Sequence, residues 1–272
     1  MPTVAIVGLG LIGSSLALAL KDAGYTAVGA DRDERTLRKA LERGIVTSAS
    51  PDLGVVDITD IVVVAVPIRA MKETLANLRG RVDGKVVTDV ASTKQQVMEW
   101  ARAAGIELVG GHPMCGRESS GIDAADASLF AGAPWILTEP SPEVEAMVEA
   151  VGARPLVMNA AEHDRLVAGV SHAAFLLSVG YVLALAGKSD WPEAGRVAAS
   201  GFRDMSRLAA GDPELYAGIS VTNREQILAR LEDVSAALAR IRRHLETDDP
   251  RLTELFEEAR QVRERWAAQS HP

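Results

Sequence analysis

A histidine at position 112 stands in a stretch, residues 110–121, that is rich in glycine and polar side chains. The apolar run at residues 106–109 just before it predicts a β-strand, and the stretch itself predicts a loop. A neutral imidazole accepts a proton near pH 7, so His112 is a candidate general base. From position alone, a buried structural histidine is an equally good interpretation.

A serine lies at a second junction of strand and helix. Ser92 follows the predicted strand at residues 85–90 and precedes a predicted helix at residues 93–103. Its hydroxyl lies at the strand end, on the edge where a cofactor would bind, and it could simply cap the helix as serine often does. One hydroxyl can serve both roles.

Two arginines four residues apart, Arg203 and Arg207, lie in a stretch that predicts a helix. Side chains at this spacing share one helix face. Two guanidinium groups on one face are suited to bidentate binding of a carboxylate, although exposed surface arginines are the ordinary explanation for such a pair. The pair is therefore a candidate site for an anionic substrate.

The N-terminal part of the chain carries a glycine pattern typical of dinucleotide binding. An apolar strand ends at Gly8, and a helix begins after Gly10 and includes Gly13. Gly8 permits a sharp turn, Gly10 leaves space for a pyrophosphate against the main chain, and Gly13 allows the helix to approach the sheet. The N–H groups that begin this helix, at Leu11 and Ile12, would face the phosphates.

An acidic residue at the end of the second predicted strand supports this interpretation. Asp31 would accept hydrogen bonds from the adenosine ribose and repel a 2′-phosphate, which favours NAD over NADP. The guanidinium of Arg32 next to it could hold that phosphate instead. Val66 and Pro67 end a further apolar strand at the same sheet edge, where ligands of open α/β sheets bind. A glycine turn that binds no nucleotide is the simpler alternative.

Strands and helices alternate over the first part of the chain, which predicts an α/β fold with a Rossmann-type doubly wound parallel sheet. Nearly continuous apolar strands are typical of a parallel sheet that is covered on both faces. The predicted strands are residues 4–7, 27–30, 58–67, 85–90, 106–109, 133–138 and 155–158. The predicted helices, after the one that follows Gly10, are residues 35–43, 68–78, 93–103 and 143–151.

From residue 160 onward the sequence has no strand signal and its pattern is helical. The predicted helices are residues 161–185, 192–210, 213–245 and 251–268. We therefore predict two domains, a Rossmann-type NAD-binding domain at residues 1–159 and an all-α domain at residues 160–272. The second domain would bind the substrate and form the dimer.

A long run without charged residues, 166–187, has the length of a membrane helix. Ser171, His172 and Ser178 interrupt it, and an all-round apolar helix also serves as the core of a domain or of a subunit interface. We therefore predict a core helix, no membrane partner, and a homodimer whose second copy covers the apolar surface.

Composition narrows the class of protein. The chain has 272 residues, 47% of them hydrophobic, and a net charge of -8, which argues against non-specific nucleic-acid binding. The single cysteine, Cys115, permits no internal disulfide and fits a reducing cytoplasm, and we interpret it as unreactive. The first strand follows the N-terminus directly, so we expect no signal peptide. The five histidines are scattered in the sequence and predict no metal site.

Over nearly its whole length the sequence resembles the prephenate and arogenate dehydrogenases, the oxidative decarboxylases of tyrosine biosynthesis. The resemblance rests on the glycine pattern and on four further motifs. These are Asp-Val-Ala-Ser-Thr-Lys at residues 89–94, His-Pro-Met-Cys-Gly-Arg-Glu-Ser-Ser-Gly at 112–121, Ser-His at 171–172, and Gly-Phe-Arg-Asp-Met-Ser-Arg at 201–207, followed by Asp-Pro at 212–213. The histidine motif and the arginine motif together are specific.

The resemblance implies NAD-dependent oxidation of a small anionic substrate, prephenate or arogenate, with loss of its ring carboxylate as CO2. It implies that His112 takes the proton from the C4 hydroxyl as hydride leaves C4, and that Ser92 orients His112 and the cofactor. Arg207 would bind the ring carboxylate. The other residues around the substrate would be Ser171, His172, Glu118 and Arg203. The helical domain would pair with its copy in a homodimer.

The sequence departs from the family pattern in two places. Family members often carry a second histidine in a Ser-His-Leu-Pro-His pattern where this chain has Phe175, and a tryptophan where it has Tyr216. These departures leave open whether the substrate carries the keto acid of prephenate or the amino acid of arogenate. The chain ends soon after its last helix, so we expect no fused mutase and no regulatory ACT domain.

Two other functions fit the same fold. β-Hydroxyacid dehydrogenases also place helices after a Rossmann domain, but they use a lysine on the helix that opens the second domain, and residues 161–187 contain none. If the chain were a non-enzymatic NAD-binding protein, no common function would explain the presence of His112, Ser92 and Arg207. We therefore predict a dehydrogenase.

Overall fold

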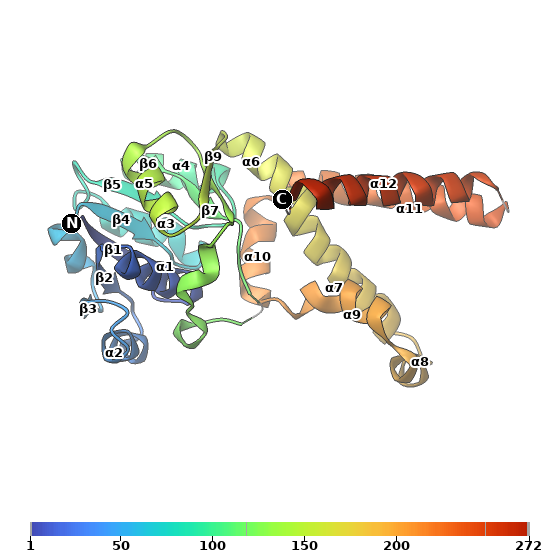
Figure 1. The fold of residues 1–272 in the computed structure, drawn as a ribbon, viewed down its shortest axis with the longest axis horizontal. Coiled ribbons are helices and arrows are strands. Elements are labelled where there is room, and N and C mark those ends of the chain that lie inside the picture. The colour runs from blue at the N-terminus through green and yellow to red at the C-terminus, as the bar shows by residue number, and fades with distance from the viewer. Residues whose placement is uncertain (1, 118, 248, 271–272) are drawn as a thin grey trace. The chain divides into compact units, whose positions relative to one another are not determined.

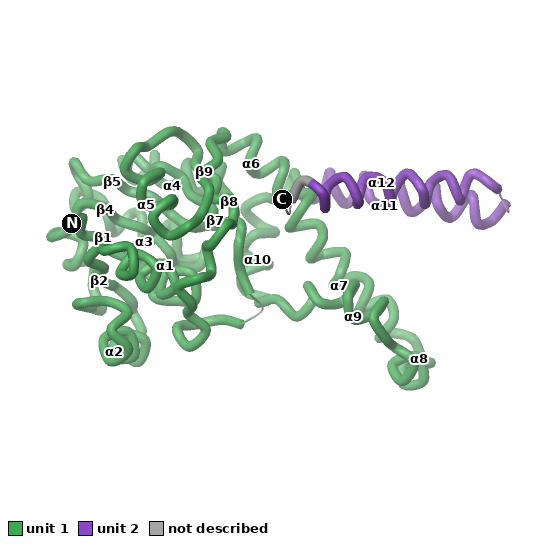
Figure 2. Tube along the Cα trace, viewed as in Figure 1, with its two compact units in different colours: residues 1–226 green, residues 227–272 purple. Residues whose placement is uncertain are grey.

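The computed structural model describes residues 2–117, 119–247 and 249–270 (Figure 1). The chain divides into two compact units, residues 1–226 and residues 227–272 (Figure 2). The predicted domain boundary between residues 159 and 160 falls inside the first unit and stays a prediction.

The core of unit 1 is a six-stranded parallel sheet in the order β3-β2-β1-β4-β5-β6. The strands are β1 (Thr3–Val7), β2 (Thr26–Ala30), β3 (Ser48–Ser50), β4 (Ile61–Val64), β5 (Val86–Asp89) and β6 (Leu108–Val109). The strand order reverses between β1 and β4, and this switch point is where open α/β sheets bind ligands. The predicted Rossmann-type doubly wound sheet is confirmed.

Helices cover both faces of this sheet. They are α1 (Leu11–Asp22), α2 (Glu34–Glu42), α3 (Ile68–Leu78), α4 (Gln95–Ala104) and α5 (Pro142–Ala150). Val4 and Ile6 of β1 pack into a core with α1, α2 and α5, whereas Ala5 and Val7 pack into a second core with α3 and α4. Because successive residues of a strand point to opposite faces, both sets must be apolar, which explains the continuous apolar runs.

The last two predicted strands, residues 133–138 and 155–158, are present in the structure, and residues 111–113 of the predicted loop form a further strand. They form a separate three-stranded sheet of β7 (Gly111–Pro113), β8 (Pro134–Leu137) and β9 (Arg154–Val157), with β7 antiparallel to β8. The prediction that residues 110–121 form a loop is therefore wrong for β7. At Gly111 the chain passes so close to β5 that an added Cβ would lie 2.3 Å from the carbonyl oxygen of Asp89.

The helical part is more divided than predicted. It contains α6 (Ala160–Val167), a π-helical turn (Ala168–His172), α7 (Ala173–Ala186), α8 (Trp191–Val197), α9 (Ser200–Ser206), a 3-10 turn (Arg207–Ala210), α10 (Pro213–Thr222), α11 (Arg224–Glu246) and α12 (Arg251–Ser270). The predicted helices 161–185, 192–210 and 213–245 are thus each interrupted.

The break after α9 has a specific cause on α7. The buried Ser178 hydroxyl donates to the carbonyl of Met205 (2.7 Å) and accepts the N–H of Ala209 (3.0 Å). These two backbone groups are four residues apart and would bond to each other in an unbroken α-helix. The hydroxyl inserted between them interrupts the helix, so α9 ends at Ser206.

Several helices expose large apolar side chains. Val170, Leu183 and Val197 are at least 66% exposed, and in unit 2 Phe256 and Trp266 are at least 54% exposed. By length and composition alone, the helical stretch Ala160–Ala186 is also sufficient to cross a membrane. A third of its most apolar segment is buried within the structure.

Candidate active site

The turn between β1 and α1 is closely packed at two of its three glycines. Gly8 has a φ of 102°, and an added Cβ there would lie 2.6 Å from the carbonyl oxygen of Ala65. A Cβ on Gly13 would lie 1.9 Å from the carbonyl oxygen of Gly8. A Cβ on Gly10 would instead meet no heavy atom within 4 Å. Gly10 therefore borders open space that suits a bound group lying against the main chain.

The start of α1 offers hydrogen-bond donors to that space. The first backbone bond of the helix runs from the Ser14 N–H to the Gly10 carbonyl (3.0 Å). The N–H groups of Leu11, Ile12 and Gly13 precede it and have no partner within the helix. Such a helix start attracts phosphate groups. The predicted phosphate site therefore fits the geometry.

Asp31 connects this turn to the end of β2. Its carboxylate accepts the N–H of Leu9 (2.8 Å) and the N–H of Asp33 (2.9 Å), and Arg32 beside it is exposed. Val66 also lies against the turn, because a Cβ on Gly8 would come within 3.0 Å of the Val66 nitrogen. The half-buried Val66 and the exposed Pro67 follow β4 directly. The predicted nucleotide-binding residues thus gather at the switch point.

Three of the five histidines form a buried group, which we call the histidine cluster: His112, His163 and His172. His112 lies on β7 and is 8% exposed; its Nδ1 is 2.8 Å from Nε2 of His163, which is fully buried on α6. His172 ends the π-helical turn and is 2% exposed. Within residues 2–117, 119–247 and 249–270, no group of His, Cys, Asp or Glu side chains is arranged to hold a metal ion.

Asp164 supports the histidine cluster from α6. Its carboxylate lies 2.7 Å from Nδ1 of His163 and accepts the N–H groups of Lys94 (2.8 Å) and Gln95 (2.9 Å). Its backbone carbonyl accepts a hydrogen bond from the Asn223 side chain (2.8 Å). One buried residue therefore joins α6, the start of α4 and the end of α10.

A buried ion pair fixes the backbone beside His112. The Lys94 ammonium is fully buried, and it donates to the Asp89 carboxylate and to the carbonyl of Gly111. The Asp89 carboxylate also accepts the N–H of Gly111 (3.0 Å). Both backbone groups of Gly111 are thus held, so the next residue, His112, is placed firmly at the carboxyl edge of the sheet.

Burial keeps two members of the cluster, His112 and His172, neutral near pH 7. Desolvation is the largest reason why the pKa of His112 lies well below its ordinary value, and the neighbouring His163, Lys94 and His172 lower it further. Burial likewise lowers the pKa of His172 to about 4, although Asp164 partly opposes this shift. A neutral His112 has a free lone pair and can accept a proton, so it fits the role of general base.

We expect the protein to lose stability as the pH falls from 6.5 toward about 4.5. An unfolded histidine binds a proton near pH 6.5, whereas His112 and His172 stay neutral in the folded protein. The unfolded state therefore binds more protons in this window, which favours unfolding, and above it the effect is absent. The melting temperature should fall between pH 7.5 and pH 4.5, and the fall should be smaller in His172→Asn.

His244 in unit 2 provides the control for this prediction, because it lies 3.0 Å from Asp249 and outside the histidine cluster. His244→Asn should keep the wild-type dependence of the melting temperature on pH. An undiminished fall in His172→Asn would contradict the assignment of this acid sensitivity to the cluster.

Ser92 is half-buried between β5 and α4, and it does not cap the helix. The structure begins α4 at Gln95, with Lys94 as the preceding residue, and the first N–H groups bond to Asp164. The alternative of Ser92 as the helix cap is therefore wrong. The backbone of Ser92 faces the His172 ring and raises the pKa of that ring slightly. Ser92 thus lies beside the histidine cluster.

The other predicted substrate residues differ in how far their side chains are buried. Ser171 is half-buried in the π-helical turn next to His172, and π-helical turns are frequent at functional sites. Arg203 is exposed on α9, and Arg207 is exposed at the start of the 3-10 turn that follows. The prediction of one continuous helix through both arginines is wrong, because Ser178 interrupts it. Glu118 lies outside the described residues.

Two aromatic rings occupy the positions where the sequence departs from the family pattern. Phe175 and Tyr216 are stacked, with centroids 3.4 Å apart and planes 4° from parallel. A Cβ on Gly211 would lie 2.8 Å from the Tyr216 ring, so the chain between the 3-10 turn and α10 passes close to the stack. The stack and the nearby chain therefore hold the apolar ring of Phe175 in one position.

The thiol of Cys115, the only cysteine of the sequence, has low reactivity. Burial raises the pKa of the Cys115 thiol to about 11. Little thiolate forms near neutral pH, and the thiolate is the reactive form. This agrees with the interpretation of Cys115 as unreactive.

Reasoning from the sequence missed His163, Asp164, Lys94 and Asn223 as parts of this site. Lys94 lies in the motif at residues 89–94, but nothing in the sequence indicates that its ammonium group is buried. His163 and Asp164 gave no signal because they lie in an ordinary helical stretch, and Asn223 gave none because the break between α10 and α11 was not predicted. Only the folded chain brings them to β7 and α4.

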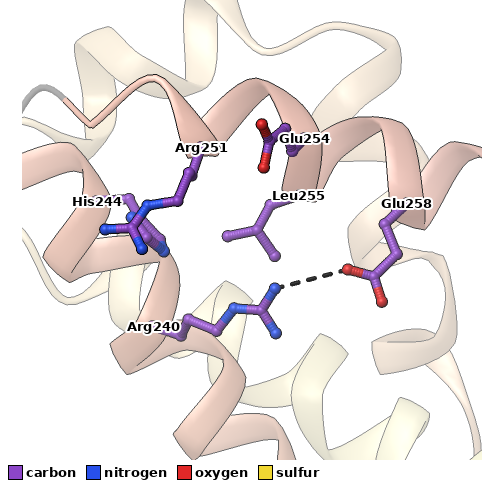
Figure 3. A pocket seen from close by; sticks show the side chains of 6 residues that line it. All are labelled: Arg240, His244, Arg251, Glu254, Leu255 and Glu258. Carbon is purple, nitrogen blue, oxygen red and sulfur yellow. Dashed lines mark ion pairs between the residues drawn. The ribbon is translucent and has the colours of Figure 1, made fainter.

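Unit 2 contains a separate cavity of about 240 Å³ between α11 and α12 (Figure 3). Its lining residues are Arg240, His244, Arg251, Glu254, Leu255 and Glu258. An ion pair of 3.5 Å between Arg240 and Glu258 crosses it, as Figure 3 shows. The lining includes no predicted site residue, and we assign it no part in catalysis.

A doubly wound sheet with an open glycine turn at its switch point, and a neutral histidine just beyond the carboxyl ends of its strands, is typical of dinucleotide-dependent dehydrogenases. Residues 16–154 match the sequence model described as prephenate dehydrogenase, nucleotide-binding domain. Residues 159–258 match the one described as prephenate dehydrogenase, dimerization domain. The chain belongs to the prephenate dehydrogenase family.

Individual relatives agree with this membership. A prephenate dehydrogenase of Lactococcus lactis is 34% identical over 278 residues, which cover 97% of this chain and 77% of that protein. The crystal structure of Synechocystis arogenate dehydrogenase matches with a TM-score of 0.85 and 33% identity, over 97% of this chain and 99% of that one. The prephenate dehydrogenase of A. aeolicus, in complex with hydroxyphenyl propionate and NAD+, matches with a TM-score of 0.90 and 27% identity, over 97% and 98%.

Proposed function

We propose that this enzyme catalyses the NAD-dependent oxidative decarboxylation of prephenate, arogenate or both, with His112 as the general base. The observation that carries the proposal is the buried, neutral His112 at the carboxyl edge of a sheet whose glycine turn is open at Gly10. Family membership supports the substrate class, because the similar proteins include ones named for prephenate and for arogenate.

The residues of the site suit each part of this chemistry. NAD, when bound, supplies the acceptor for the hydride that leaves ring C4. His112 takes the proton of the C4 hydroxyl, and the oxygen keeps the electron pair and forms a carbonyl. The bond between the ring and its carboxylate then breaks to release CO2, the electron pair enters the ring, and the oxygen regains a proton as a phenol. Because the product is aromatic, positioning and one base suffice.

The cofactor would lie along the residues at the switch point. Gly8, Gly10 and Gly13 shape the turn, Leu11 and Ile12 offer N–H groups to the phosphates, and Val66 and Pro67 border the space. The Asp31 carboxylate is placed to accept the ribose hydroxyls, which favours NAD over NADP. Exposed Arg32 is the residue that would allow some use of NADP.

Initial rates of NADH formation at 340 nm test the proposal in four combinations, prephenate or arogenate with NAD or NADP. We expect turnover of at least one substrate and a preference for NAD. The ratio of the two substrates would establish the side-chain preference that the Phe175–Tyr216 stack leaves open. Absence of turnover in all four combinations would contradict the proposed function.

Arg207 would bind the ring carboxylate, with Arg203, Ser171, His172 and Glu118 around the substrate. We expect Arg207→Ala to raise KM by about tenfold or more, because loss of a charged partner costs a few kcal/mol of binding. Because the change removes binding and not the base, kcat should change much less. Steady-state kinetics with the preferred substrate measure both constants.

Arg240→Ala is the matched control for Arg207→Ala, because it removes an arginine from the cavity of unit 2. It should leave KM unchanged. An unchanged KM in Arg207→Ala would assign Arg207 to the surface and remove it from the substrate site.

We also propose that the protein is a cytoplasmic homodimer. Its helical part matches the family's dimerization domain, and the exposed apolar residues of α7, α8 and unit 2 would gain cover from a second copy. Light scattering at micromolar concentration should give twice the 28.8 kDa mass of one chain. A monomeric mass would contradict the dimer.

A further inference from the structure

We propose that Asp164 is a positioning residue that sets the tautomers of the histidine cluster, so that His112 carries its proton on Nδ1 and presents an unprotonated Nε2. The catalytic meaning of this inference rests on the proposed function, but the tautomers themselves do not.

The first step is that Asp164 can only accept hydrogen bonds. Its side chain is fully buried, and each of its two oxygens already accepts a backbone N–H, one from Lys94 and one from Gln95. Backbone N–H groups cannot accept, so both oxygens face donors. With a backbone donor already at each oxygen, the Asp164 side chain acts as an acceptor.

The second step concerns His163, which lies between Asp164 and His112. Its Nδ1 faces the Asp164 carboxylate at 2.7 Å, so this nitrogen must carry the proton. A neutral imidazole has one donor nitrogen and one acceptor nitrogen, so Nε2 of His163 is the acceptor. This Nε2 lies 2.8 Å from Nδ1 of His112, and the two rings meet edge to face at 72°.

The third step follows for His112. Its Nδ1 faces an acceptor and therefore donates, which leaves the lone pair of this neutral ring on Nε2. Nε2 is then the atom that accepts a proton from the substrate. The imidazolium that forms still donates through Nδ1 to His163, and the Asp164 carboxylate stabilises it at the far side of His163. His163 and Asp164 thus orient the base and support its charged form without touching the reacting atoms.

A second chain of hydrogen bonds, from the backbone carbonyl of Asp164 through Asn223, gives His172 the opposite tautomer, with its proton on Nε2. The Asp164 carbonyl oxygen can only accept, so the amide nitrogen of Asn223 must face it, at 2.8 Å. The same nitrogen lies 3.2 Å from Nδ1 of His172 and offers it the second amide hydrogen. Nδ1 of His172 is then an acceptor, and the proton of this neutral ring resides on Nε2. That nitrogen has no hydrogen-bond partner of normal geometry among the described residues.

Nuclear magnetic resonance of the full-length protein labelled with ¹⁵N-histidine tests these tautomers without any substrate. Long-range ¹H–¹⁵N correlations at pH 7.5 should show His112 and His163 protonated on Nδ1 and His172 protonated on Nε2. The variants His112→Asn, His163→Gln and His172→Asn would assign the signals, with His244 as a ring outside the cluster. A proton on Nε2 of His112 or His163, or an imidazolium at His163, would overturn the inference.

Two substitutions of His163 separate a positioning role from a merely structural one. His163→Gln retains an acceptor oxygen beside a donor N–H, whereas His163→Leu has neither. We expect His163→Leu to lower kcat by about 10²–10⁴-fold with little change in KM, since loss of the correct tautomer has an effect of this size in the serine proteases. His163→Gln should recover kcat to within about tenfold of the wild type.

Equal kcat values for the two His163 variants, at equal melting temperatures, would contradict the positioning role. If either variant fails to fold, the tautomers measured in the wild-type protein decide the inference. A protein that turns over neither prephenate nor arogenate but shows the expected tautomers would refute the proposed function and leave this inference intact.

Discussion

Replacement of His112 by asparagine should lower kcat by about 10²–10⁴-fold while NAD still binds. Asparagine cannot take up a proton, so the hydroxyl of the substrate would lose its base. The nucleotide space at Gly10 is formed by other elements, so the dissociation constant of NAD should not change. Stopped-flow or steady-state rates at 340 nm give kcat, and calorimetric titration gives the NAD affinity.

His244→Asn is the matched control for His112→Asn, since His244 also lies within hydrogen-bond distance of a second side chain, Asp249, but in unit 2. Its kcat should equal that of the wild type. If His112→Asn retained wild-type turnover, His112 would have no part in the mechanism, and the base would have to be sought elsewhere in the cluster.

Substitution of Gly13 by alanine should destabilise the protein by about 3 kcal/mol, at the upper end of the range for overpacked sites. The new Cβ would lie 1.9 Å from the Gly8 carbonyl oxygen and 3.1 Å from the Ile6 side chain, and the first of these atoms belongs to the backbone. Either α1 or the glycine turn must move. Thermal unfolding should show a melting temperature lower by roughly 10 °C.

Gly10→Ala is the matched control for Gly13→Ala, because its Cβ would meet no heavy atom within 4 Å. Its melting temperature should stay within about 2 °C of the wild type. NAD affinity should nevertheless fall by about tenfold or more, because the methyl group enters the space where the phosphates would lie. Equal melting temperatures for the two variants would contradict the close packing at Gly13, and unchanged NAD affinity in Gly10→Ala would remove Gly10 from the cofactor site.

The Rossmann-type part of the fold could be predicted because its signals are local. The strand before Gly8, the helix after Gly10 and the acid at Asp31 lie close together in the sequence, and each pattern reports its own element. The continuous apolar strands also indicated a sheet covered on both faces. The second sheet could not be predicted, because the strand β7 is three residues long and depends on the contact between Gly111 and Asp89.

The breaks in the helical part and the support of the site come from contacts that are distant in sequence. Ser178 interrupts the helix before Arg207 from α7, and Asp164 caps α4 from α6. Neither contact changes the helical periodicity of the sequence, so the sequence predicted longer helices. For the same reason, Ser92 was considered as the cap of α4 in place of Asp164. The same holds for His163, whose role depends on its distance from His112. Position and residue type identified His112 as a candidate base, but only the fold brings His163 and Asp164 next to it.

The most direct test of oxidative decarboxylation compares the NADH and the CO2 formed by the purified wild-type protein from its preferred substrate. Absorbance at 340 nm measures NADH, and trapped ¹⁴CO2 from ring-carboxyl-labelled prephenate or arogenate measures decarboxylation. We expect equal amounts of both products at every time point, together with 4-hydroxyphenylpyruvate or tyrosine. NADH without CO2, or no NADH from either substrate, would contradict oxidative decarboxylation as the function of this protein.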